Sequence, residues 1–271
     1  NITQGLSYKN LEEHRYYSDE VTLPTTAAEV TGNTISNPKQ ATFDRIRLSY
    51  GEIDSITDKD GNALSANGAT GTLSYSYTDA AGVTQTDGEL KVTVYDTFED
   101  WAKASQTADN TYNITDGEAV FIKESGELIL SSDASSTIKS GRASLDVNYT
   151  KTGFNKGEVR PEYYNNCTNI TDAAKPVEYI KFENGKEIYQ DINYVVAANQ
   201  TLTVNTQASA VFDASIGRDV DAMIEAVKFA QDANNKVEEL EKMQKMQEYS
   251  SDDCQAALED WIAAAKKERD Y

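Results

Sequence analysis

The clearest feature of the sequence is a change of hydrophobic period after Ser215. Two runs with the alternation typical of strands, Asp191–Ala198 and Thr201–Thr206, are separated by Asn199–Gln200, the length of a two-residue hairpin loop. Beyond Ser215 apolar residues recur every three or four positions, which predicts a long amphipathic helix that ends near Gln247. The candidate helix-packing or subunit-seam residues on this stripe are Ile216, Val220, Met223, Ile224, Val227, Val237 and Leu240.

A second helix is predicted beyond Ser250, Ser251 and Asp252, because these residues form an N-cap cluster before renewed helical spacing. The short joint predicts an antiparallel helical hairpin or one long kinked helix. The stripe on the first helix then has two interpretations. It is a core face packed on the chain's own strands, or it is a seam for partner helices, and both can hold in an assembly subunit.

The middle of the chain has the period-2 pattern of a β-rich domain. Strands are predicted over Phe43–Ile56, Gly71–Gly82, Glu89–Thr97 and Ser144–Thr150, and a hairpin over Glu118–Asp133 with its turn at Gly126. Short helices are predicted over Thr97–Gln106, with Trp101 pointing inward, and over Asp133–Ser140. Asn184–Gly185 is a candidate type I′ turn.

These elements predict an α+β fold with a nested organisation. An elongated base of β-hairpins plus a C-terminal long helix or helical hairpin would comprise residues 1–24 and 166–271. A β-rich α+β domain, residues 25–165, would be inserted into it as the outer part. The chain begins without Met and ends inside a helical pattern, so we expect it to be a piece of a longer protein.

Composition narrows the classes of function. The formal net charge is −20, which argues against binding to nucleic acid or to an anionic membrane surface, because both need a basic patch. No run of the sequence approaches the length of a membrane-spanning apolar helix. Cys167 and Cys254 are too few for a disulfide framework, and we expect both to be free thiols.

The inventory of reactive residues predicts no enzyme and no cofactor. His14 is the single histidine, so neither a histidine-based triad nor a typical zinc site can be assembled. Phosphate-binding glycine motifs are absent. The run Asp58–Asn62 begins like a calcium-binding loop, but Ala63 and Ala69 stand where glycine and glutamate are needed, which favours a β-turn. Asn-x-Thr triplets, such as Asn148–Thr150, are expected in a chain this rich in Asn and Thr.

Three stretches carry a resemblance to a known family. LTVNTQASAVFDASIGRDVDAMIEAVKFA, GFNKGEVRPEYYNNCTN and NITQGLSYKNLEEHRYYS resemble segments of the bacterial flagellin family, in particular the flagellin-like hook-associated proteins of the hook–filament junction. In that family a strand pair ends in a V-N-T-like segment and a V-F pair and leads into the long C-terminal core helix. The resemblance is specific over residues 150–235, weaker over 1–20, and vague over the middle of the chain.

The resemblance implies a structural subunit that connects hook and filament, exported by the flagellar type III route without a cleaved signal peptide. It implies as partners like subunits, the hook-side junction protein and flagellin. Because the terminal helices that drive polymerisation lie outside this chain, we expect the chain itself to be a monomer. A flagellin or divergent flagellin is the alternative within the family. A surface adhesin or carbohydrate-binding module, displaying Tyr side chains and Trp101, is the alternative from another class.

Overall fold

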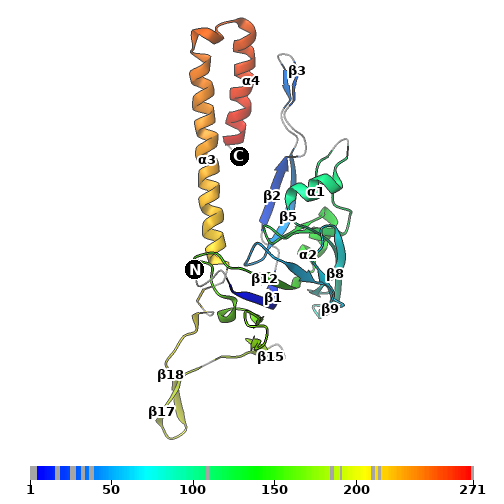
Figure 1. Ribbon diagram of the computed structural model, residues 1–271, viewed down its shortest axis with the longest axis vertical. Coiled ribbons are helices and arrows are strands. Elements are labelled where there is room, and N and C mark those ends of the chain that lie inside the picture. Colours follow the sequence, from blue (N-terminus) through cyan, green and yellow to red (C-terminus); the bar gives the residue numbers. More distant parts are fainter. Residues whose placement is uncertain are drawn as a thin grey trace. The chain divides into compact units, whose positions relative to one another are not determined.

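The computed structural model describes residues 5–15, 19–24, 29–31, 34–36, 40–107, 110–183, 186–189, 191–208, 211–212 and 215–269. Within them the chain is α+β, as the sequence predicts, and it contains a large sheet and two long C-terminal helices (Figure 1). The Asn184–Gly185 turn lies outside the described residues. Contacts divide the chain into two compact units, residues 1–21, 43–106 and 113–217, and residues 22–42, 107–112 and 218–271.

The elements follow in chain order. The strands before the first helix are β1 (Ser7–Arg15), β2 (Asp19–Pro24), β3 (Glu29–Thr31), β4 (Thr34–Ser36), β5 (Gln40–Arg47), β6 (Ser55–Thr57), β7 (Ala63–Leu64), β8 (Ala69–Thr78) and β9 (Thr84–Tyr95). Next come α1 (Phe98–Ser105), β10 (Glu118–Ile122), β11 (Glu127–Leu130), α2 (Ser132–Ser140), β12 (Ser144–Thr152) and the 3₁₀ turn Pro161–Tyr163. The chain continues with β13 (Asn166–Asn169), β14 (Val177–Tyr179), β15 (Phe182–Glu183), β16 (Lys186–Glu187), β17 (Asn193–Ala197), β18 (Gln200–Thr203), α3 (Ile216–Gln244) and α4 (Asp252–Arg269).

The large sheet joins segments that are distant in sequence. Its strand order is β14, β13, β1, β12, β8, β9, β10, β11, β5, β2, and β6 and β7 extend it beside β12. β1 pairs antiparallel with β12 on one side and with β13 on the other, with Leu11 opposite Tyr149 and Tyr8 opposite Asn169. β9 and β10 run parallel, because α1 lies in the connection between them. The predicted hairpin around Gly126 is confirmed as β10 and β11.

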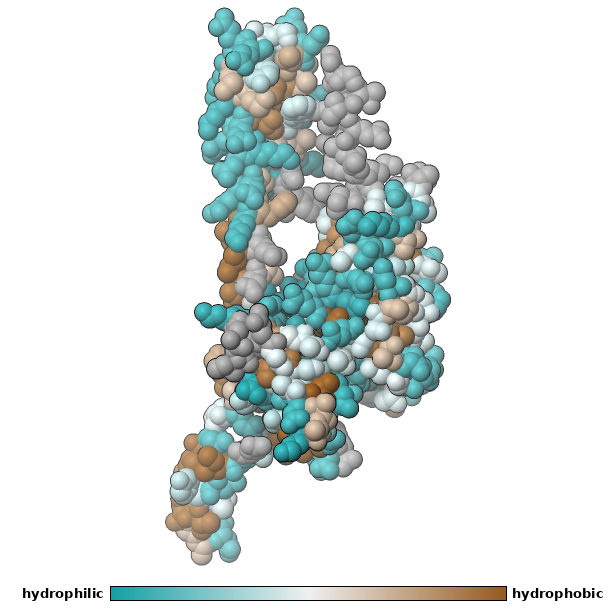
Figure 2. Space-filling view, viewed as in Figure 1, coloured by the Kyte–Doolittle hydropathy of each residue, from teal (hydrophilic) through white to brown (hydrophobic). Residues whose placement is uncertain are grey.

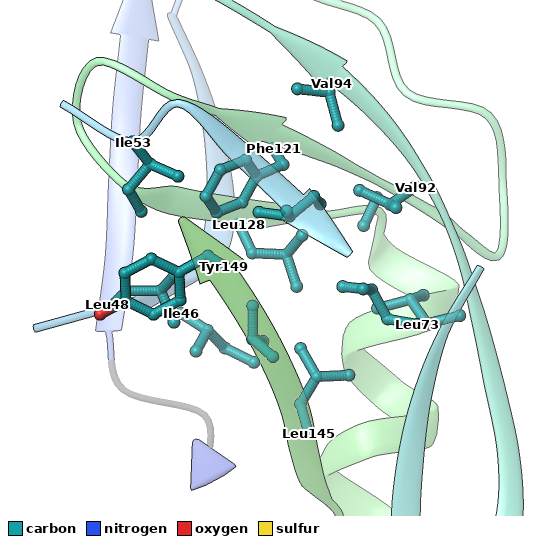
Figure 3. Packing of buried hydrophobic residues seen from close by; sticks show 14 of the residues in the cluster. Ile46, Leu48, Ile53, Leu73, Val92, Val94, Phe121, Leu128, Leu145 and Tyr149 are labelled. Atoms are coloured by element: carbon teal, nitrogen blue, oxygen red, sulfur yellow. The ribbon is translucent and has the colours of Figure 1, made fainter. Parts of the chain in front are cut away.

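One face of this sheet and α2 enclose the main hydrophobic core. Val92, Phe121 and Leu128 come from three adjacent strands and lie together with Leu145 and Tyr149 of β12 (Figure 3). Ala134 and Ile138 of α2 belong to the same cluster. The helix starts here because the Ser131 hydroxyl accepts a hydrogen bond from the Ala134 N–H, the usual N-cap arrangement.

The opposite face of the central strands is covered at α1. Trp101 is fully buried and lies edge-on to Phe43, with ring centroids 5.7 Å apart. Thr97 caps this helix by accepting from the Asp100 N–H, as its sequence predicts. Because Ala119–Ile122 of β10 and all of β11 are buried, the apolar runs Ala119–Ile122 and Leu128–Leu130 reflect packing on both faces.

The observed units differ from the nested division expected from the sequence. β1 was expected in the base and β12 in the inserted domain, yet they are neighbours in one sheet. The physical reason is that β1 carries Tyr8 and Leu11 on its buried side, and these complete the main core beside Tyr149. The predicted strand over Phe43–Ile56 is likewise divided into β5 and β6, with a loop between them.

Candidate assembly surface on the helical hairpin

The C-terminal helices form an antiparallel hairpin whose contact lies in the second half of α3. Ala233 and Val237 of α3 are buried, as are Leu258, Ile262 and Ala265 of α4. Lys266 Nζ lies 2.8 Å from Glu241 Oε1, and this hydrogen bond lowers the pKa of the Glu241 carboxyl. The two helices run side by side in Figure 1.

The turn between the helices is closed by one side chain. The Gln255 side-chain amide donates to the Gln244 carbonyl at 3.0 Å and to the Tyr249 carbonyl at 2.7 Å. These carbonyls belong to the end of α3 and to the 3₁₀ turn Gln247–Tyr249, where backbone acceptors lack helical partners. At the other side of the joint, the Ser251 hydroxyl accepts from the Cys254 N–H at the start of α4.

The first half of α3 has no such cover. The exposed fractions there are 43% for Ile216, 45% for Val220, 64% for Met223, 47% for Ile224 and 53% for Val227. α3 has 29 residues and α4 has 18, so at 1.5 Å per residue they span about 43 Å and about 27 Å. The described part of α4, which ends at Arg269, therefore lies beside the second half of α3 only.

The uncovered apolar face is wider than the seam of a two-helix contact. Heptad steps back from Val237 lead to Met223 and Ile216, which lie on the line that faces α4. At about 100° per residue, Val227, Val220 and Ile224 lie about 40°, about 60° and about 100° round the helix from Met223, so the face is broadened on one side. Figure 2 shows apolar residues along this part of α3. The face is therefore wide enough to contact more than one neighbouring helix or strand.

The structure thus divides the predicted stripe at its middle. Val237 is buried and Leu240 is half-buried against the hairpin, whereas the five residues from Ile216 to Val227 are exposed. Sequence reasoning named all seven residues, but their spacing cannot show which are covered. It also missed the exposed apolar residues of β17 and β18, which it treated only as strands. The alternation of apolar and polar residues along these two strands was the signal that could have revealed them.

Elsewhere, the buried polar groups around Glu13 and Lys151 are engaged in structural contacts. Glu13 is 4% exposed and accepts hydrogen bonds from the Ser49 N–H, the Tyr149 hydroxyl and, at 2.7 Å, Arg15 Nε. Burial beside this carboxylate raises the pKa of the Tyr149 hydroxyl. Lys151 is fully buried, and its ammonium donates to the Gly51 carbonyl at 2.8 Å. These groups tie β1 and β12 to the loop after β5.

The candidates for metal and ligand chemistry have ordinary roles. Asp58 accepts from the backbone N–H groups of Asp60 and Asn62 and so forms the predicted β-turn. His14 hydrogen-bonds Asp146 at 2.7 Å and is half exposed. In the part of the chain that the structure describes, no group of three or more His, Cys, Asp or Glu side chains could hold a metal ion. Cys167 and Cys254 are free thiols.

The aromatic side chain proposed for display is instead part of the fold. Trp101 is fully buried, and its indole N–H donates to the Asn113 carbonyl at 3.1 Å. A cavity of about 350 Å³ lies beside it, lined also by Tyr95, Ser105 and Glu118. The Asn113 side-chain amide donates to the Ser105 carbonyl, and Glu118 pairs with Lys91 at 2.6 Å, so these two lining residues already have partners.

No protein-family model, curated protein or solved structure matches this chain. Among the described residues, none of the helices combines the length and the apolar character needed to cross a membrane. The surface that stands out is the uncovered half of α3.

Proposed function

We propose that this chain is part of a structural subunit of the bacterial flagellum, a flagellin-like junction protein that connects hook and filament. The observation that carries the proposal is the broad apolar face on the first half of α3, which continues a helix–helix contact but is left uncovered. Apolar surface exposed to water costs about 25 cal/mol per Å², so an apolar helix face of this kind is typically covered by another element. A subunit that buries it against its neighbours gains that free energy on assembly.

The charge of the chain fits the same role. A net charge of −20 makes the surfaces that remain exposed in a filament repel one another, which opposes bundling. Polymerisation must then rely on apolar faces such as the one on α3. The resemblance of the segment from Leu202 to Ala230 to flagellin-like proteins supports the flagellum as the location of the assembly. We infer no catalytic role for this subunit.

Localisation tests the proposal directly. In a bacterium that carries the gene, gold-labelled antibodies against residues 43–106 are expected at the junction between hook and filament. Labelling along whole filaments would favour the alternative of a flagellin. Labelling of the cell envelope away from flagella would contradict the proposal and favour an adhesin.

A matched pair of variants tests the role of α3. Ile224→Asp places a charge on the uncovered face, whereas Val83→Asp places the same charge at a residue of similar exposure, 54% against 47%. Both proteins should fold, as checked by circular dichroism. We expect Ile224→Asp cells to lose filaments from their hooks and to stop swimming, and Val83→Asp cells to swim normally. Normal swimming of both strains would refute the role given to α3.

A further inference from the structure

A second uncovered apolar surface lies on the hairpin of β17 and β18, here called the arm. Within the described residues these two strands pair with each other and with no other strand. Tyr194 lies opposite Leu202, and the Val204 N–H donates to the Ile192 carbonyl at 3.0 Å. These four side chains share one face of the arm, because side chains alternate between faces along a strand. All four are more than half exposed. Figure 2 shows apolar surface over this part of the chain.

The other face of the arm is polar apart from Val195. The Thr203 hydroxyl donates to the Asn193 side-chain carbonyl at 2.6 Å, and Val195 lies opposite Thr201. The arm is therefore amphipathic, a pattern typical of a sheet that is covered on one side. A two-stranded hairpin is marginally stable by itself in water, so such an arm gains stability from further strands.

Neither edge of the arm is paired with another strand in the part of the chain that the structure describes. In an antiparallel ladder, residues between hydrogen-bonded pairs direct their N–H and C=O groups outward. Since Ile192 and Val204 form a hydrogen-bonded pair, the outward groups belong to Asn193 and Val195 on one edge and to Thr201 and Thr203 on the other. Proteins usually protect such edges with proline or charged side chains. The sequence from Ile192 to Phe212 contains neither, although 26% of the whole chain is charged.

We propose that the arm pairs edge to edge with the arm of a second copy of this chain. β18 of one copy lies beside β17 of the next, so that copies related by a simple shift form one continuous antiparallel sheet. Their apolar faces then lie on the same side. The absence of charge favours a second copy as the occupant, because two chains of net charge −20 repel each other least where an uncharged segment of one meets the same segment of the other.

This pairing leaves one free edge at each end, so further copies can be added. Each copy offers the β18 edge to one neighbour and the β17 edge to the other, which makes the contact heterologous and suited to rings or filaments. It is a different surface from the face of α3 and goes beyond the proposed function, since it applies to any assembly of parallel copies. The paired edges are short and bury far less than the roughly 1,200 Å² of a stable interface. Free chains therefore stay mostly monomeric, and pairing is expected when copies are concentrated.

Disulfide trapping between two single-cysteine variants tests the register. Thr201 and Val195 lie directly opposite each other in the arm. When the next copy is shifted perpendicular to the strands, Thr201 of one copy is therefore opposite Val195 of the next, with about 5.5 Å between their Cα atoms. Identical residues of adjacent copies would be two strand spacings apart, about 9.6 Å. A disulfide spans the first distance and not the second.

Val195→Cys and Thr201→Cys are made in a Cys254→Ser background. Cys167 can stay, because burial raises the pKa of its thiol to about 12 and leaves little reactive thiolate. The two proteins, one of them carrying a size tag, are mixed at high concentration and oxidised gently, and the three possible dimers are separated by size. If disulfides formed at random, half of all dimers would be heterodimers. A clearly larger share of heterodimers supports the pairing. A statistical mixture, an excess of homodimers, or no dimers at the highest concentration would overturn it.

A blocking variant separates edge pairing from other contacts. Thr203→Pro in the Thr201→Cys protein removes an outward N–H that the hairpin does not use, and should abolish the heterodimer. Thr203→Val keeps that N–H and should retain the heterodimer; equal yields from the two variants would overturn edge pairing. Ile224→Asp should leave the heterodimer unchanged, so this test and that of the proposed function can fail separately.

Discussion

Replacing valine by alanine at two positions of α3 measures how unevenly its apolar stripe is covered. Val237 is 3% exposed and Val227 is 53% exposed. Removing two carbon groups from the buried side chain loses about 1.6 kcal/mol, at about 0.8 kcal/mol per group, and incomplete relaxation of the cavity adds to this. The higher helix propensity of alanine offsets about 0.6 kcal/mol at either position. We therefore expect Val237→Ala to destabilise the helical hairpin by about 1–2 kcal/mol, and Val227→Ala to leave it unchanged or slightly more stable.

The assay follows the helices directly. Urea unfolding monitored by helical circular dichroism gives the change in free energy of unfolding, and amide hydrogen exchange assigns that change to α3 and α4. Each variant is the other's control, because residue type, substitution and helix are the same. Equal destabilisation by both substitutions would mean that the two halves of α3 are covered alike, and would refute both the division of the stripe and the surface built on it.

Two further predictions concern buried and titrating groups of the sheet. Glu13→Gln should destabilise the chain by about 3 kcal/mol in urea unfolding followed by tryptophan fluorescence, because it removes the buried partner of Arg15 and Tyr149; Glu99→Gln, at an exposed pair with Lys103, should change stability by less than about 1 kcal/mol. The hydrogen bond to Asp146 raises the pKa of His14, so the folded state binds this proton more tightly than the unfolded chain. Its contribution is complete below the unfolded pKa of about 6.5 and is lost as pH rises through the folded value. His14→Gln should reduce the loss of unfolding free energy that accompanies this rise in pH. A folded-state pKa of His14 at or below about 6.5 in an NMR titration would contradict the reasoning.

Local elements were accessible from the sequence because local chemistry sets them. Thr97 predicts the start of α1 since its hydroxyl can accept from the third residue of the helix. The change from period 2 to period 3.6 predicts the start of α3, and the Ser250–Asp252 cluster predicts the break before α4. The loop of the arm is shifted by one residue, to Ala198–Asn199, because Asn199 adopts a positive φ of 62°, which asparagine tolerates.

Tertiary structure decided which of these elements meet. Period-2 patterns give each strand a buried face but no partner, so nothing local to β1 shows that β12 and β13 flank it. The same holds for α3, because the helical period places both Val227 and Val237 on the predicted apolar stripe. Which of them is covered depends on where another helix docks: among the described residues α4 lies beside Val237, which is buried, whereas Val227 is exposed.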